Sequence, residues 1–219
     1  MNRVRHSRPA EIVFHWYIDR LMRKNFNSFV LLGEQPVPSP DKAILATPNH
    51  ISWWDGFFID RMRRVLFPEK KLHLMMLEEQ LLKYPFFNKV GAFGIDPGKP
   101  KKVLDALRYT AQVLEQPENL AVIYPQGEIE SQELPVLSQK PGITKIAEFA
   151  GKEFLLMPVF FKIMYKDQPK PELFSAVYTP LSSGQAAGYR EYFQESYMNF
   201  RALCERYYKT GEGTVVSIF

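Results

Sequence analysis

The sequence contains one cysteine, Cys204, among its 219 residues. A single cysteine cannot form a disulfide within the chain, and the four histidines do not stand with it at the spacing of a zinc site. A disulfide scaffold and a structural zinc site are therefore excluded. Because a lack of disulfides is typical of a reducing compartment, we expect a cytoplasmic protein that holds no metal ion.

Long hydrophobic runs are also missing. The longest uncharged apolar run covers residues 154–161, which is eight residues, and it contains Pro158. A helix that spans a bilayer needs about 20 apolar residues. The N-terminal region has no long apolar stretch of the kind found in secretory signals. We therefore expect no membrane-spanning segment and no export.

The excess positive charge is confined to the N-terminal segment. The whole chain carries a net charge of +4, and residues 1–24 alone hold six basic and two acidic side chains, so the rest sums to zero. A wide apolar face interrupts these charges: Ile12, Val13, Phe14, Trp16, Tyr17, Ile18, Leu21 and Met22. Such a composition predicts an amphipathic basic helix within residues 1–27 that lies in a membrane interface, with the protein peripheral on the inner face. The alternative is a helix docked on its own domain, and nucleic acid is disfavoured because no groove-reading motif is present.

The remaining residues, 28–219, predict a single α/β domain. With 46% apolar, 14% aromatic and 24% charged residues, the chain can bury a full core. Strand patterns cover residues 28–33, 43–47, 71–76, 120–124, 154–162 and 176–180, and helical patterns cover 56–66, 78–89, 101–115, 142–150 and 185–209. Alternation of this kind favours a mixed, largely parallel sheet flanked by helices.

A histidine and an aspartate stand five residues apart just after a predicted strand. His50 follows the strand at 43–47, and Asp55 stands where the chain enters the next helix. The carboxyl ends of strands are where α/β folds bind ligands. If the Asp55 carboxylate accepts the Nδ1 proton of His50, Nε2 is left free as a general base. A structural surface pair is the competing interpretation.

Four segments of the chain resemble the glycerolipid acyltransferase family. Residues 49–56 resemble its H-x4-D signature, and residues 91–97 and 124–130 are similar to its second and third blocks. Residues 155–159 resemble the fourth block, with a family-like turn at 140–142 before it. The resemblance covers about residues 28–180.

This resemblance implies an acyltransferase with His50 as the base and Asp55 as its partner. The donor is acyl-CoA or acyl-ACP as a co-substrate, so an acyl carrier protein is a possible partner, no bound cofactor is expected, and the acceptor is a lipid hydroxyl. The oxyanion is expected to bind the backbone near Gly127 or the amide of Gln126. The residues expected to bind substrate are Asn49, Gly91, Lys99, Lys101, Lys102, Tyr124, Pro125, Gln126, Gly127 and Glu128. The alternatives are a catalytically silent lipid- or partner-binding domain and a thioesterase.

Two departures from the family pattern concern the acceptor. Family members that use phosphate-bearing acceptors have arginines where this chain has Pro97 and Ile129, and Glu128 and Glu130 flank Ile129. Arginine is the residue that forms two parallel hydrogen bonds with phosphate. Three lysines past the second block offer point charges in their place, or form a solvated helix start: Lys99, Lys101 and Lys102. We therefore expect an acceptor without a terminal phosphate monoester.

Overall fold

One mixed sheet forms the centre of the molecule in the computed structural model, which describes residues 2–213 and 215–219. Within these residues the strand order is β4-β3-β5-β2-β6-β7-β1-β9, and β8 pairs with β6. The strands are β1 (Ser28–Leu32), β2 (Ile44–Pro48), β3 (Lys71–Leu77), β4 (Ala92–Ile95), β5 (Asn119–Val122), β6 (Leu155–Met164), β7 (Glu172–Val177), β8 (Leu181–Ser182) and β9 (Val215–Ser217). From β4 to β6 all neighbours are parallel, whereas β7 runs antiparallel to β6. The predicted fold class is confirmed.

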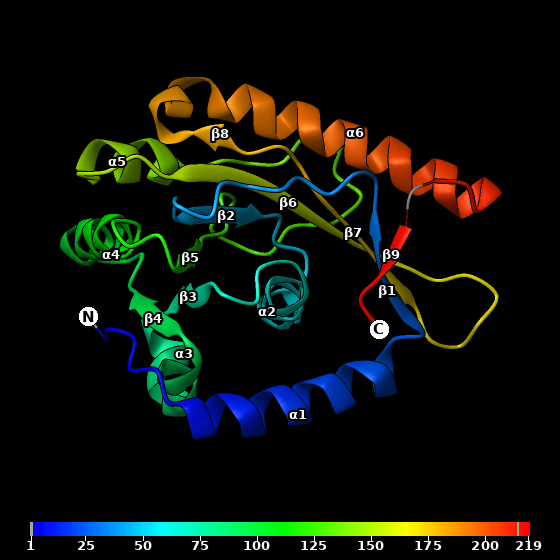
Figure 1. The fold of residues 1–219 in the computed structure, drawn as a ribbon, viewed down its shortest axis with the longest axis horizontal. Helices are drawn as coiled ribbons and strands as arrows, with labels where there is room; N and C mark the ends of the chain where they lie inside the picture. Colours follow the sequence, from blue (N-terminus) through cyan, green and yellow to red (C-terminus); the bar gives the residue numbers. More distant parts are fainter. Residues whose placement is uncertain (1, 214) are drawn as a thin grey trace.

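Helices cover both faces of this sheet (Figure 1). They are α1 (Arg8–Asn25), α2 (Asp55–Leu66), α3 (Glu78–Lys83), α4 (Pro100–Val113), α5 (Gly142–Phe149) and α6 (Tyr189–Thr210), with the 3₁₀ turns η1 (Pro85–Val90) and η2 (Ser183–Gly188). Alternate strand residues point to opposite faces, so Leu45 of β2 packs toward α4, α5 and α6, while Ile44 and Ala46 pack toward α1 and α2.

Several elements differ from the sequence-based prediction. The helix expected at 185–209 begins at Tyr189 because residues 183–188 form η2, and the short strands β8 and β9 were not predicted. The helix expected at 78–89 is split into α3 and η1, because Pro85 keeps Tyr84 out of helical geometry (φ −127°, ψ 70°). The strand expected at 176–180 lies at 172–177, where it pairs with β1 and β6. The four residues of β4 were interpreted as part of a motif and not as a strand.

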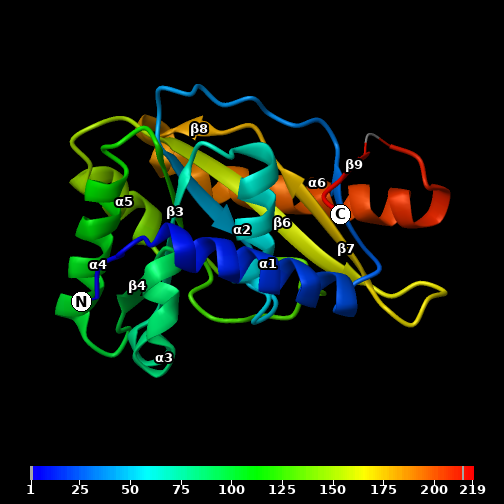
Figure 2. The ribbon, with the colours of Figure 1, turned by 60° about the horizontal axis from the view of Figure 1, so that its bottom comes forward.

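The N-terminal helix α1 packs on the core of the domain. Ile18 and Met22 are buried in the same cluster as the apolar side of α2. Asp19 forms ion pairs with Arg61 and Arg64 of α2. Figure 2 shows α1 lying across the α2 side of the molecule, with α3 close to one end. No helix in the described ranges is long and apolar enough to cross a bilayer.

Candidate active site

His50 and Asp55 are joined by a hydrogen bond at the carboxyl end of β2. The strand ends at Pro48, a short loop follows, and α2 begins at Asp55. His50 Nδ1 lies 2.8 Å from Asp55 Oδ2, and the same oxygen accepts the backbone N–H groups of Ile51 at 2.7 Å and Ser52 at 2.9 Å. One carboxylate oxygen thus fixes both the imidazole and the loop that carries it.

The surroundings of Asp55 determine which atoms of the His50–Asp55 pair carry protons. The side chain is fully buried, and burial raises the pKa of the carboxyl group, while the hydrogen bonds from His50, Ser52 and Ile51 act in the opposite direction. Because Nδ1 faces the carboxylate, it carries the proton in neutral histidine. Nε2 has no hydrogen-bond partner in the part of the chain that the structure describes, so it can receive a proton from a substrate.

Tyr124 covers one side of the imidazole. It follows β5, and its ring stacks on His50 with 4.1 Å between centroids and 20° between planes. The hydroxyl group is buried without a hydrogen-bond partner among the described residues. Burial raises the pKa of this phenol well above its usual value, and the charge of Asp55 raises it further. The phenol is therefore neutral and packs as an aromatic wall.

The loop after β5 is bound directly to the His50 backbone. Gln126 Oε1 accepts the His50 N–H at 2.6 Å, and Gln126 Nε2 donates to His50 O at 3.3 Å and to Glu130 Oε2 at 2.8 Å. The N–H of Gly127 donates to Tyr124 O at 3.0 Å. The Gln126 amide and the N–H of Gly127 are therefore engaged within the protein, and the Gln126 side chain holds the histidine loop in place.

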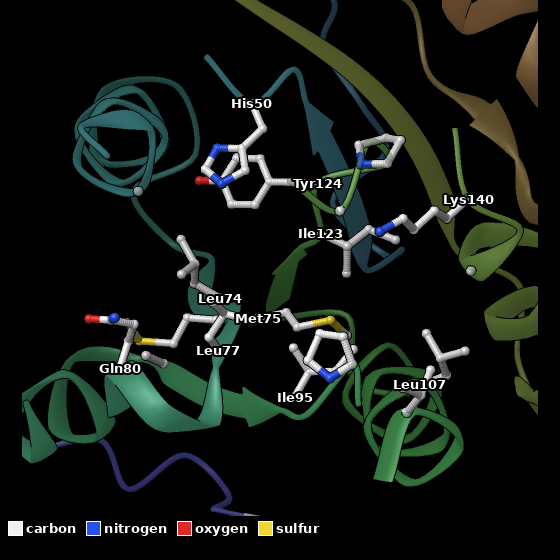
Figure 3. Close-up of a pocket in the computed structure, with 18 of the residues that line it drawn as sticks. His50, Leu74, Met75, Leu77, Gln80, Ile95, Leu107, Ile123, Tyr124 and Lys140 are labelled. Carbon is white, nitrogen blue, oxygen red and sulfur yellow. The ribbon is translucent and has the colours of Figure 1, made fainter. Parts of the chain in front are cut away.

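A large apolar cavity opens beside His50 (Figure 3). Its volume is about 1100 Å³, and its lining comes mainly from β3, η1, α4 and the loops after β4 and β5. Leu74, Met75 and Leu107 are among the apolar side chains that face it. No aspartate or glutamate is among the described residues that line it, and its cationic side chains are Lys140 and Lys145. The site thus combines one base with a long apolar chamber.

Two residues expected to bind substrate do not line the cavity and instead have structural roles in the backbone. Asn49 is fully buried, and its side-chain amide exchanges hydrogen bonds with the backbone of Phe161 at 3.0 and 2.8 Å, which ties β2 to β6. Gly91 has φ +107°, and a Cβ there would lie 2.5 Å from the carbonyl oxygen of Leu72. These contacts account for an asparagine and a glycine at the two positions.

The three lysines expected at the site lie outside the cavity lining. Lys99 pairs with Asp96 at 3.2 Å, Lys102 pairs with Glu78, and Lys101 is exposed on α4. Glu128 is also exposed and does not line the cavity.

Of the other expected residues, all but Gln126 line the cavity. Tyr124, Pro125 and Gly127 line it, and so do Pro97 and Ile129 at the positions of the family arginines. Lys140 lines it as well, although sequence reasoning gave its side chain no role. The feature of the sequence that could have pointed to Lys140 was its position in the Lys-Pro-Gly turn before α5.

The chain was compared with known proteins. A sequence model of the acyltransferase family matches residues 29–162, and no curated protein sequence matches the chain. The chain has the fold of the 1-acyl-sn-glycerophosphate (LPA) acyltransferase PlsC from Thermotoga maritima, with a TM-score of 0.58 and 13% identity. That match covers 91% of this chain and 80% of PlsC. The family match spans more than half of the sequence, and the chain therefore belongs to the acyltransferase family.

Proposed function

We propose that this enzyme transfers an acyl group from an acyl thioester, on coenzyme A or acyl carrier protein, to a hydroxyl group of a lipid acceptor. The observation that carries the proposal is the His50–Asp55 pair, with Nε2 available, at the wall of a large apolar cavity. A base next to an apolar chamber suits a reaction in which a fatty chain enters and a hydroxyl group loses its proton.

The chemistry is a direct transfer. The acceptor oxygen bonds to the thioester carbon while its proton passes to His50 Nε2. Asp55 stabilises the imidazolium through the 2.8 Å contact to Nδ1. When the tetrahedral intermediate collapses, the carbon–sulfur bond breaks and the sulfur takes the proton from His50, so that an ester and a free thiol leave. No covalent bond to the enzyme is required.

The cavity provides the site for the acyl chain. Each CH₂ group transferred from water into such a chamber contributes about 0.8 kcal/mol. Phe14 of α1 and Phe87 of η1 contribute to the lining beside β3, so elements far apart in the sequence close the chamber. The fatty acyl chain packs in this cavity while the thioester carbon faces His50.

The lining supports an acceptor without a terminal phosphate monoester. Such a group carries close to two negative charges and is held best by the paired hydrogen bonds of arginine. Pro97 and Ile129 occupy the corresponding positions, and both face the cavity. Suitable acceptors are a lysophospholipid with a substituted headgroup or a neutral glycolipid.

The exposed face of α1 supports peripheral binding to a membrane. Ile12, Val13, Trp16 and Tyr17 are 62%, 62%, 66% and 53% exposed, although the helix packs on the domain through its other side. Apolar side chains with tryptophan and tyrosine, flanked by basic residues, are typical of interfacial helices. Phe14 of the same helix lines the cavity, so α1 contributes to the active-site chamber as well as to the exposed face.

An acceptor screen tests the proposal. Labelled acyl-CoA and acyl-ACP are each incubated with the enzyme and a panel of lipid alcohols, and the lipid products are resolved by mass. The expected result is an acylated lipid that forms only when an acceptor is present. Release of free fatty acid without an acceptor indicates a thioesterase, and binding of thioester without turnover indicates a silent domain; both results contradict the proposal.

A further inference from the structure

Lys140 is an exposed residue that places a positive charge in the lining of a mainly apolar cavity. The other lysine of the lining, Lys145, forms an ion pair with Glu148 at 2.6 Å. Lys140 Nζ has no hydrogen-bond or ion-pair partner among residues 2–213 and 215–219. The charge of Glu130 interacts with Lys140 through space and lowers the Glu130 pKa, but the Glu130 carboxylate is hydrogen-bonded to Gln126 and Ser138 and does not line the cavity. An ammonium group with no hydrogen-bonded protein partner, at the wall of an apolar chamber, can donate to an anionic part of a ligand.

The backbone aims this side chain into the cavity. The Lys140 N–H donates to Pro125 O at 2.8 Å, which fixes the segment before α5 against the loop after β5. The side chain then crosses Gly127, where a Cβ would lie 2.7 Å from Nζ and 2.7 Å from Cδ. Gly127 has φ +72°, so glycine is favoured there for conformation as well as for space. In Figure 3 Lys140 extends from its own segment toward the side of the cavity that holds Tyr124.

We propose that Lys140 binds a phosphate diester anion of a substrate whose chain occupies the cavity. A lysine offers a compact point charge, which suits the single negative charge of a diester, whereas a monoester dianion calls for arginines. Pro97 and Ile129 add no charge, so Lys140 carries this contact alone. The inference rests on the proposed function, since it places a substrate in the cavity. The diester belongs either to the acceptor headgroup or to the phosphopantetheine arm of an acyl-ACP donor, where the phosphate that joins the arm to the carrier protein is also a diester with one negative charge.

A binding measurement tests the charge without requiring turnover. The probes are dodecyl methyl phosphate and the neutral 1-O-dodecylglycerol, below their micelle concentrations, with binding followed by the fluorescence of Trp53, which lines the cavity. We expect Lys140→Met to weaken binding of the phosphate diester at least tenfold, as is typical for loss of a charged hydrogen bond worth about 1.5–3 kcal/mol. Binding of the glycerol ether should change less than twofold, and Lys140→Arg should retain diester binding.

The control variant is Lys209→Met, which removes the same charge from the exposed end of α6, where Lys209 pairs with Glu205. It should bind both probes as the wild type does. The proposal is overturned if Lys140→Met binds the diester normally, if it weakens both probes equally, or if Lys209→Met shows the same loss.

Steady-state kinetics then identify the source of the diester. In Lys140→Met, a higher KM for a lysophospholipid with unchanged KM for acyl-ACP assigns the anion to the acceptor, and the reverse assigns it to the donor. Unchanged KM values for both contradict the proposal. If the wild type transfers no acyl group at all, the proposed function fails, while the probe measurement still decides the role of Lys140.

Discussion

The ring of Tyr124 stacks on the imidazole of His50, with 4.1 Å between their centroids and 20° between their planes. This contact fixes the plane of the imidazole and places an aromatic face against a ring that becomes positively charged during the proposed reaction. Interactions of a cation with an aromatic face contribute about 0.5–2 kcal/mol. Tyr124 is therefore expected to act through His50 as a positioning residue.

We expect Tyr124→Leu to lower kcat about tenfold and to move the acid limb of the pH–rate profile to lower pH, because the imidazolium loses its aromatic neighbour. The matched control is Tyr124→Phe, which keeps the stack and removes a hydroxyl group that has no partner among the described residues. It should retain kcat within about threefold. A pH profile that is the same in Tyr124→Leu and the wild type would show that the ring only fills space.

The local parts of the site could be predicted from the sequence. His50 and Asp55 are five residues apart, so a strand end and a helix start suffice to bring them together. The continuous, mainly apolar run of β2 likewise predicts a strand that is buried on both faces of a parallel sheet.

The parts that depend on strand order could not be predicted. Gln126 contacts the His50 backbone from 76 positions away, and Asn49 contacts Phe161 from 112 positions away. These bonds exist because β2 lies between β5 and β6, and a local pattern does not contain that order. Lys140 was missed for the same reason, since a lysine before a Pro-Gly turn has the local pattern of a solvated surface turn.

The buried side chain of His73 is expected to make the free energy of unfolding depend on pH. Burial, together with the smaller effect of the nearby His6, whose ring lies edge-on at 5.1 Å, lowers the His73 pKa from 6.5 to about 4. Between these two values the unfolded chain binds a proton that the folded chain does not, so the free energy of unfolding falls as pH falls through this window.

We expect the titration of His73 to lower the free energy of unfolding by up to about 3 kcal/mol between pH 7 and pH 4. Urea unfolding of the wild type and of His73→Gln at several pH values measures it, because glutamine cannot titrate. Parallel curves for the two proteins would show that His73 is not the group responsible.

The membrane proposal predicts that α1 binds lipid through its outward face. Deletion of residues 1–24 would also remove Ile18 and Met22 from the core, so point substitutions are the appropriate test. We expect Trp16→Ser to weaken binding to vesicles with anionic lipid about tenfold, since burial of a large apolar side chain contributes about 1.5–3 kcal/mol. The control is Val37→Ser, which changes a side chain that is 96% exposed in the loop between β1 and β2. This variant should bind the vesicles as the wild type does. Equal binding by Trp16→Ser in a flotation assay would exclude this face.

The side chain at position 129 is expected to determine which lipid acceptor the enzyme prefers. It lines the cavity where family members with phosphate-bearing acceptors have an arginine. When lysophosphatidate and a lysophospholipid with a substituted headgroup compete for limiting acyl-CoA, the wild type should acylate the substituted lipid. Ile129→Arg should gain lysophosphatidate use by about tenfold, because arginine supplies a charged hydrogen-bond pair. A clear preference of the wild type for lysophosphatidate would refute the proposed acceptor class.

The central claim is that His50 is the general base, oriented by Asp55 through the 2.8 Å bond to Nδ1. The most direct test is the rate of acyl transfer by His50→Ala at saturating thioester and acceptor, with folding checked by thermal unfolding and donor binding by the fluorescence of Trp53. We predict a folded protein that binds donor and transfers acyl groups about 10²–10⁴-fold more slowly, the usual contribution of general-base catalysis. Transfer at near wild-type rate by His50→Ala would contradict the account.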